Sequence, residues 1–458
     1  MNIWLPTVSL HSLVIVVSIL AYILTTRAGR VRRPPSIAIA WVLGMIALPY
    51  LALPMYLMFG RRKLPRRPSR LAGTRTTERH WAEDLIASFG LPKASPALIA
   101  MHQDGTESAA ALFATMSSAV SRLDICTFIL GDDPFGREVM QHMMARARSG
   151  VEVRLLLDGV GAIQLPKACF RALQLGGVET AIFSPLLARK TQGPRNLRNH
   201  RKMVIADGAR LWAGGRNLAA EYFTGAAGAP PWLDLTFDLQ GPVASAAASQ
   251  FEFDWVAAGG KPASAGIEAA AVSRGSAADA LGEAQFVPSG PDQSEDTVHS
   301  LLIDACFHAR ERMIAVTPYF VPDVGLETAM RLAARRGVRI DLCIPASSNH
   351  RLADFARNRS LRSLGNAGVN VHLLPYMSHA KAVVFDHTLG LSGSVNLDSR
   401  SLLLNYECAV VFYGRGEIDW LASWIEALIP KTALFDCRPP GLFRDLCEGL
   451  LLTVAYQL

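Results

Sequence analysis

Two stretches of the chain carry the same polar residues at the same spacing. Residues 199–217 read NHRKMVIADGARLWAGGRN, and residues 378–396 read SHAKAVVFDHTLGLSGSVN. The shared positions, each displaced by 179 residues, are His200, Lys202, Asp207, Gly214 and Asn217 in the first copy and His379, Lys381, Asp386, Gly393 and Asn396 in the second. A repeat at this level of detail indicates an internal duplication.

The spacing predicts that each copy gathers three polar side chains at one spot. Residues i and i+2 of a strand share a face, so His200 and Lys202 should point the same way. A hairpin turn centred on residues 208–209 would place Asn217 opposite His200. The second copy gives the same pairing with a turn at residues 387–388. Each copy would then present one imidazole, one ammonium and one carboxamide.

Two such clusters facing each other would surround an anion and suit phosphoryl or phosphatidyl transfer through a phosphohistidine. One imidazole attacks phosphorus, while the other protonates the leaving alcohol and then deprotonates the incoming one. Lysines and asparagines stabilise the phosphoryl oxygens. Asp207 and Asp386 lie at odd spacing, so we expect them at the turn or bracing a neighbouring element. The predicted catalytic set is His200, Lys202, Asp207, His379, Lys381 and Asp386.

Further residues could hold the substrate or orient the histidines. Asp234, in PPWLDLTFDLQGP, and Glu407, in NYECAVVFY, could each support a histidine from behind, or be ordinary surface or turn acids. The predicted substrate-binding set is Asn217, Asn396, Ser394, Asp234 and Glu407. No carboxylate cluster or His/Cys ligand pattern indicates a metal, so we expect a site without metal or other cofactor.

One basic stretch occurs only in the first copy. It contains Arg189, Lys190, Arg195 and Arg198, just before His200. It could receive anionic headgroups, or be a solvated loop.

The rest of each copy predicts an α/β fold. Segments 150–159 and 123–130 resemble 337–345 and 311–320, with strongly apolar strand cores between helical stretches. We expect repeats at 71–258 and 283–430, joined by an Ala/Gly/Ser-rich connection at 259–282. Residues 431–458 are expected to form an amphipathic tail on the bilayer, with a plain packing helix as the alternative.

The positive charge of the chain is confined to its N-terminal segment. The formal net charge is +7, but residues 1–70 contain ten Arg or Lys and no acid, and the remainder carries 36 basic and 39 acidic residues. A general nucleic-acid surface is therefore not expected. Charge-free runs over 8–25 and 36–60, flanked by arginines, predict a transmembrane hairpin kinked at Pro49 and Pro54. Seven scattered cysteines favour a reducing compartment, so we expect the catalytic part in the cytoplasm.

The paired motif, H-x-K-x4-D followed by G-[SG]-x-N, resembles the signature of the phospholipase D superfamily over residues 110–430. FVPSGPD (286–292), TPYFVPD (317–323) and NLDSRSLLLNYE (396–407), with the N-terminal runs, are most similar to bacterial cardiolipin synthases. The resemblance implies two pseudo-symmetric α/β/α repeats facing each other and a multi-pass protein of the bacterial cytoplasmic membrane. It implies metal-free phosphatidyl transfer between two phosphatidylglycerol molecules, with His200 as nucleophile and His379 as acid/base.

Other functions use the same residues. A hydrolase, either a phospholipase releasing phosphatidic acid or a membrane-tethered nuclease, would differ in letting water reach the phosphohistidine. The charge distribution argues against the nuclease, and two complete motifs argue against an inactive lipid-binding scaffold. The residues leave open whether phosphatidylglycerol or phosphatidylethanolamine is the acceptor, which histidine attacks, and the oligomeric state. Gly215, where the second copy has Ser394, makes the two halves chemically unequal.

Overall fold

The computed structural model describes residues 10–29, 35–60, 81–185, 196–226, 228–263 and 282–454. The arginine clusters at 30–33 and 61–70, and most of the expected connection at 259–282, lie outside these ranges. So do Arg189, Lys190 and Arg195 of the basic stretch.

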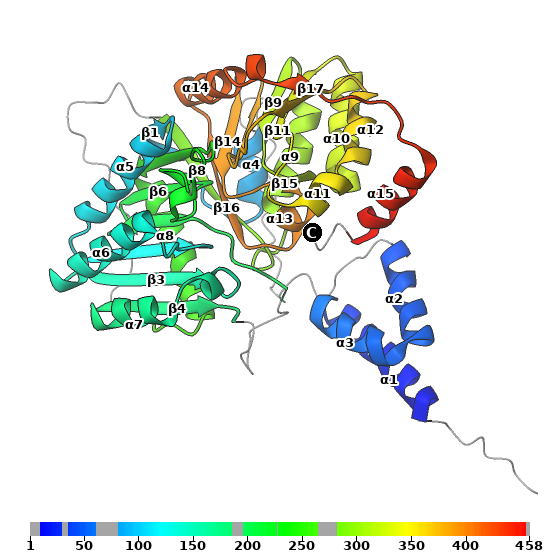
Figure 1. Cartoon of the computed structure of the whole chain (residues 1–458), viewed down its shortest axis with the longest axis horizontal. Helices are drawn as coiled ribbons and strands as arrows, with labels where there is room; N and C mark the ends of the chain where they lie inside the picture. The colour runs from blue at the N-terminus through cyan, green and yellow to red at the C-terminus, as the bar shows by residue number, and fades with distance from the viewer. Residues whose placement is uncertain are drawn as a thin grey trace, which may run out of the picture.

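One sheet of fifteen strands runs through both copies and shows the duplication directly (Figure 1). The first copy contributes, in spatial order from the centre, β1 (Ser95–His102), β7 (Thr236–Gln240), β6 (Arg210–Gly214), β5 (Met203–Ala206), β2 (Arg122–Thr127), β3 (Glu152–Asp158) and β4 (Val178–Phe183). The second contributes, again from the centre, β8 (Gly282–Ser289), β16 (Glu407–Phe412), β14 (Leu389–Gly393), β13 (Ala382–Phe385), β9 (Arg312–Val316), β11 (Arg339–Pro345) and β12 (Asn370–Leu374). The expected α/β class and the two equivalent halves are thus confirmed.

Helices cover the sheet because its strands are apolar on both faces and must be buried. Strands β2, β3 and β4 pair in parallel, as do β9, β11 and β12, which requires crossover connections. The helices of the first half are α5 (Gly105–Ser118), α6 (Pro134–Arg148), α7 (Lys167–Leu175) and α8 (Pro242–Ala257), with short helices η1 (Gly161–Gln164) and η2 (Ala220–Tyr222). Those of the second half are α9 (Thr297–His308), α10 (Val324–Arg335), α11 (Arg351–Ala356), α12 (Asn358–Gly365), α13 (Ser399–Leu403) and α14 (Arg415–Glu426). A small parallel pair joins β10 (Phe320–Val321) to β15 (Leu397–Asp398).

The two halves share one interior. Strands β1 and β8 pair antiparallel at the centre of the sheet, and one apolar cluster draws side chains from both halves, including Phe237 and Phe412 with ring centroids 5.3 Å apart. Helix α4 (Trp81–Ser88) packs on α9 of the second half, where Trp81 stacks on His308 at 4.2 Å. The sequence predicts this segment within the first repeat, 71–258, whereas the helix packs on the second half before the chain enters the strands of the first.

The motif hairpins differ by one residue from the register that the sequence predicts. Ala206 pairs with Arg210, and the second copy pairs Phe385 with Leu389, so each turn contains three residues instead of two. The first turn residue in each copy, Asp207 or Asp386, has a positive φ of 53° or 50°. Aspartate tolerates this left-handed conformation better than most residues, and it allows the longer turn.

The N-terminal helices depart from the expected pair of spans. Helix α1 covers Leu10–Gly29, but the second apolar run forms two helices, α2 (Pro35–Ala47) and α3 (Pro49–Phe59). The chain folds back between them, since Trp41 and Tyr56 rings lie 5.2 Å apart. Pro49 begins α3, whereas Pro54 lies inside it. Over the described residues, none of the helices combines the length and the apolar character needed to cross a bilayer.

The C-terminal segment belongs to the second half. Strand β17 (Ala433–Leu434) pairs with β12, after the short helix η3 (Ile429–Lys431). Helix α15 (Leu442–Val454) packs against α11 and α12, and Glu448 forms ion pairs with Arg362 and Arg444. Leu442 and Phe443 at its start are exposed.

Candidate active site

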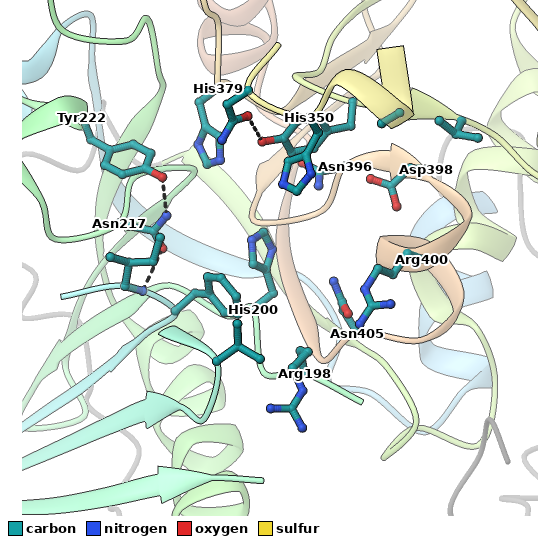
Figure 2. Close-up of a pocket in the computed structure, with 17 residues that line it drawn as sticks. Arg198, His200, Asn217, Tyr222, His350, His379, Asn396, Asp398, Arg400 and Asn405 are labelled. Carbon is teal, nitrogen blue, oxygen red and sulfur yellow. Dashed lines mark hydrogen bonds between the residues drawn. The ribbon is translucent and has the colours of Figure 1, made fainter. Parts of the chain in front are cut away.

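The duplicated motifs meet at one pocket between the two halves. Its cavity volume is about 300 Å³, and both His200 and His379 line it, together with Asn217 and Asn396. Figure 2 shows the two imidazoles directed toward one another across this space. The central expectation from the sequence, two histidines sharing one pocket, is therefore confirmed.

Each histidine is fixed to the opposite half by backbone hydrogen bonds. The His200 N–H donates to the Tyr406 carbonyl at 2.8 Å, and the His379 N–H donates to the Leu233 carbonyl at 2.6 Å. Tyr406 and Leu233 directly precede Glu407 and Asp234. The pairing therefore brings the carboxylate of each half behind the histidine of the other.

Glu407 supports His200. Its carboxylate accepts from His200 Nδ1 at 3.0 and 3.1 Å, and it also accepts from the hydroxyls of Ser394 (2.5 Å) and Ser401 (2.6 Å). Burial raises the pKa of Glu407, but its interaction with the His200 ring, the charge of Lys202 and its hydrogen bonds outweigh that effect, so the pKa falls below its usual value. An ionised carboxylate only accepts, so His200 carries its proton on Nδ1 and turns a free Nε2 lone pair outward.

This network corrects the role expected for Ser394. The side chain is fully buried, and its hydroxyl donates to Glu407 instead of facing the pocket. It acts on His200 through the carboxylate.

Asp234 supports His379 in the same way. Its carboxylate accepts from His379 Nδ1 at 2.8 Å and from the Leu235 N–H at 2.7 Å. Gly215 occupies the position equivalent to Ser394 because a Cβ there would lie 2.1 Å from Asp234 Oδ1. In the first copy the Asp234 carboxylate thus occupies the space that a serine side chain at position 215 would need.

Both lysines are fully buried beside the histidine of their own motif, and Lys381 Nζ lies 3.0 and 3.1 Å from the two ring nitrogens of His379. Lys202 donates to the His200 carbonyl at 2.8 Å, and Lys381 donates to the His379 carbonyl. Burial lowers the pKa of Lys202 to about 8. Burial, together with repulsion by Lys202, lowers the pKa of Lys381 to about 7. Two ammonium groups held this close favour an anion in the pocket.

Both imidazoles are neutral at neutral pH. Burial and the nearby lysines lower the pKa of His379 to about 3, against the opposing attraction of Asp234. Burial also lowers the pKa of His200. A neutral imidazole can act as a nucleophile or accept a proton.

Asn217 reaches the pocket by a different route from the one predicted. With the observed register, β6 ends at Gly214, whose φ of 145° turns the chain out of the strand before Asn217. Asn217 then donates to the Tyr222 hydroxyl at 2.8 Å and accepts from the Ile129 N–H at 3.3 Å.

Asp207 and Asp386 do not belong to the catalytic group, which corrects that part of the prediction. They lie at the turns and brace a neighbouring strand, as their odd spacing predicts, away from the pocket lining. Each accepts from the first backbone N–H of β2 or β9 and from the two N–H groups before it. Asp207 accepts from Val120, Ser121 and Arg122, and Asp386 from Arg310, Glu311 and Arg312, at 2.8–3.0 Å. Both are bracing residues.

The pocket contains side chains that the motif did not reveal. The polar and aromatic ones are Phe128, Arg198, Tyr222, Tyr319, Asn349, His350, Asp398, Arg400 and Asn405. Asp398, Arg400 and Asn405 lie within the segment NLDSRSLLLNYE, whereas nothing in the spacing marks Tyr222, whose ring packs edge-on against His379 at 5.0 Å. Among the described residues, no group of three or more His, Cys, Asp or Glu is arranged to hold a metal ion.

Comparison with known families agrees with this geometry. The family model described as "Cardiolipin synthase, PLD-like domain" matches residues 112–228 and 302–429, one segment in each half. The chain belongs to this phospholipase D-like cardiolipin synthase family. A second model, described as "Phospholipase_D-nuclease N-terminal", matches residues 14–61.

Two members of the cardiolipin synthase family align along most of their length. Cardiolipin synthase A of Pseudomonas aeruginosa is 31% identical, over 94% of this chain and 91% of the relative. Cardiolipin synthase A of Pseudomonas entomophila is 29% identical over 85% of both. The crystal structure of phosphatidylserine synthase from Haemophilus influenzae has the same fold, with a TM-score of 0.62, 13% identity, and coverage of 83% of this chain and all of the other.

Proposed function

We propose that this protein is a cardiolipin synthase that transfers a phosphatidyl group from one phosphatidylglycerol to another and releases glycerol. The observation that carries this function is the pocket in which His200 and His379 face each other, each held through Nδ1 by a carboxylate of the opposite half. The full-length similarity to cardiolipin synthases supports the same assignment.

The residues support a two-step transfer. The His200 Nε2 attacks the donor phosphorus, a P–N bond forms, and the P–O bond to glycerol breaks as His379 delivers a proton to the leaving oxygen. The acceptor hydroxyl then gives its proton back to His379 and attacks phosphorus, which breaks the P–N bond. Lys202, Lys381, Asn217 and Asn396 stabilise the phosphoryl oxygens. Since both imidazoles start neutral, His379 takes up a proton from solvent as the anionic phosphate arrives, and this is the proton it delivers to the leaving oxygen.

A hydrolase that releases phosphatidic acid is the alternative, and the pocket favours transfer. The His379 side chain is only 4% exposed and His200 13%, so bulk water has limited access to the phosphohistidine.

The test uses purified protein with phosphatidylglycerol vesicles. Cardiolipin and glycerol should form together, and His200→Ala and His379→Ala should abolish both. Phosphatidic acid as the sole lipid product would identify the hydrolase, and no turnover in the unmutated protein would refute both activities. We expect EDTA to leave the rate unchanged, because ammonium groups supply the positive charge at the phosphate; inhibition by EDTA would contradict a metal-free mechanism. Labelled phosphatidylethanolamine added to the vesicles tests which lipid is the acceptor, because its label should enter cardiolipin only if it takes part in the transfer.

We also propose that the N-terminal helices hold the catalytic part at a bacterial membrane. Large apolar side chains on α1, α2 and α3 face outward, including Leu24, Leu43, Leu51 and Leu57, all more than half exposed. The sequence-based hypothesis places two spans here and the catalytic part in the cytoplasm. Protease treatment of sealed inner-membrane vesicles of either orientation tests it: the catalytic part should be cleaved only where the cytoplasmic face is outside.

A further inference from the structure

The pocket is symmetric in its reacting groups but not in its charge. The displacement of 179 residues that relates the motifs also relates Arg198 to Met377 and Arg400 to Glu221. The His200 side of the pocket therefore has two arginines where the equivalent positions have a methionine and a glutamate. The duplicated chemistry does not require this difference, so it points to a separate task.

The two arginines come from opposite halves and line the same pocket. Figure 2 shows Arg198 and Arg400 on either side of Asn405, and all three residues line the pocket that contains His200. Arg198 is buried, and its guanidinium donates to the Ser184 carbonyl (3.0 Å) and hydroxyl (2.8 Å). These contacts fix the position of the side chain.

Arg400 is anchored across the interface between the halves. It extends from α13 and donates to the Asn196 carbonyl at 2.9 Å. Burial lowers its pKa, Asp398 and Asp158 oppose that effect, and the charge of Arg198 lowers it further. Holding like charges together in a half-buried pocket is unfavourable unless an anion joins them.

Two carboxylates lie near the pair. Asp158 contacts Arg198 at 3.4 Å and balances its charge. Burial raises the pKa of Asp398 to about 6, so this group can take up a proton when an anion arrives. An anion beside Arg400 would then meet a net positive charge.

Synthesis of cardiolipin requires a second anion site. The donor phosphate lies between the histidines, but an acceptor phosphatidylglycerol brings its own phosphodiester, one glycerol unit from the attacking hydroxyl. Water, the acceptor of a hydrolase, brings no second phosphate. A transferase thus has a use for two guanidiniums beside its nucleophile that a hydrolase lacks.

We propose that Arg198 and Arg400 bind the phosphodiester of the acceptor phosphatidylglycerol while its glycerol hydroxyl reaches the phosphohistidine. This subsite rests on the proposed function. The hydroxyl oxygen forms a bond to phosphorus, the bond from phosphorus to His200 breaks, and the proton passes to His379. The arginines select an acceptor that carries a phosphate.

A competition between two acceptors tests the subsite. Full-length protein is given vesicles of phosphatidylglycerol together with 1-butanol, which has no phosphate, and cardiolipin and phosphatidylbutanol are measured in the same sample. Both products come from one phosphohistidine, so their ratio does not depend on the amount of folded enzyme. Arg400→Gln and Arg198→Gln should each lower the ratio of cardiolipin to phosphatidylbutanol about tenfold, since each removes a charged hydrogen bond to phosphate.

Two further variants control for charge and for general effects. Arg400→Lys keeps the positive charge, which can bind phosphate as a point charge, and should hold the ratio within about threefold of the unmutated protein. Arg335→Gln changes an exposed arginine on α10, outside the pocket, and should leave the ratio unchanged.

The outcomes separate the subsite from the proposed function. An unchanged ratio in both arginine-to-glutamine variants would refute the subsite, even though cardiolipin is made. No cardiolipin from the unmutated protein would instead refute the proposed function. If Arg400→Gln forms neither product, the ratios of Arg198→Gln and Arg400→Lys decide: a lowered ratio in the first with recovery in the second supports the subsite, and any other pair of ratios overturns it.

Discussion

Replacement of Glu407 by glutamine should slow formation of the phosphohistidine strongly, although the two side chains have nearly the same shape. Glutamine preserves the volume of the side chain but removes the negative charge that faces His200 Nδ1. It can also turn an NH2 group toward the ring, which favours a proton on Nε2 and removes the attacking lone pair. The perturbation therefore acts on the charge and the tautomer of one imidazole.

The expected loss follows from this contact. A hydrogen bond to a charged group contributes about 1.5–3 kcal/mol, which corresponds to roughly 10- to 150-fold in rate. Loss of the correct tautomer moves the effect of Glu407→Gln toward the upper end, about 100-fold. Ser401→Ala is the control, because it removes the Ser401 hydroxyl that donates to the same carboxylate and accepts from the Asn396 N–H, but leaves the negative charge opposite His200 in place. That change should cost about 1 kcal/mol, or roughly fivefold.

The assay is rapid quenching with phosphatidylglycerol labelled in the phosphatidyl part, followed by measurement of label bound to protein. Glu407→Gln should slow the appearance of the phosphohistidine. Asp234→Asn, which disturbs His379, should slow both steps in which a proton is transferred. A Glu407→Gln rate no lower than that of Ser401→Ala would refute the role of the carboxylate, and label retained on His379 in place of His200 would reverse the two histidines.

Three further predictions concern packing, protonation and the turns. Gly215→Ser should lower turnover at least about tenfold, measured by cardiolipin formation, because its Cβ would displace Asp234; activity close to that of the unmutated protein would show that the carboxylate has room to move. The value of kcat/KM should fall as the pH rises above about 7, since Lys381 then loses its proton in the free enzyme. The fall in kcat should come at higher pH, because bound phosphate stabilises the Lys381 ammonium. If kcat and kcat/KM fell at the same pH, this explanation would be contradicted. Asp207→Ala should lower the free energy of unfolding by about 1–2 kcal/mol, measured with urea, with less than a twofold change in kcat, because its partly exposed carboxylate braces a turn away from the pocket; a large loss of kcat in folded protein would return it to the catalytic group.

Several features of the fold were predictable because their signals are local. The duplicated motif identifies two equivalent halves, and the apolar segments around it become paired parallel strands β2–β3 and β9–β11. The hairpin register was missed by one residue in both copies. A turn of two or three residues depends on whether Asp207 adopts a positive φ, which its contacts with the start of β2 determine.

The N-terminal region shows a different limit. Its composition predicts apolar helices, and they are present, but composition does not reveal that α2 and α3 fold back on each other around Leu48. The reversal is stabilised by ring contacts of Tyr56 with both Tyr22 and Trp41, which lie far from it in sequence.

The reacting groups could be identified without coordinates: two histidines and two lysines at fixed local spacing, and an α/β framework to carry them. Which acid serves which histidine depended on the fold, since Glu407 lies 207 residues from His200 and reaches it through pairing between the halves. The fold likewise decided that Ser394 supports Glu407, and that Arg198 and Arg400 share one pocket. Local spacing fixes which side chains share a face of one strand, whereas contacts between distant segments depend on how complete layers pack.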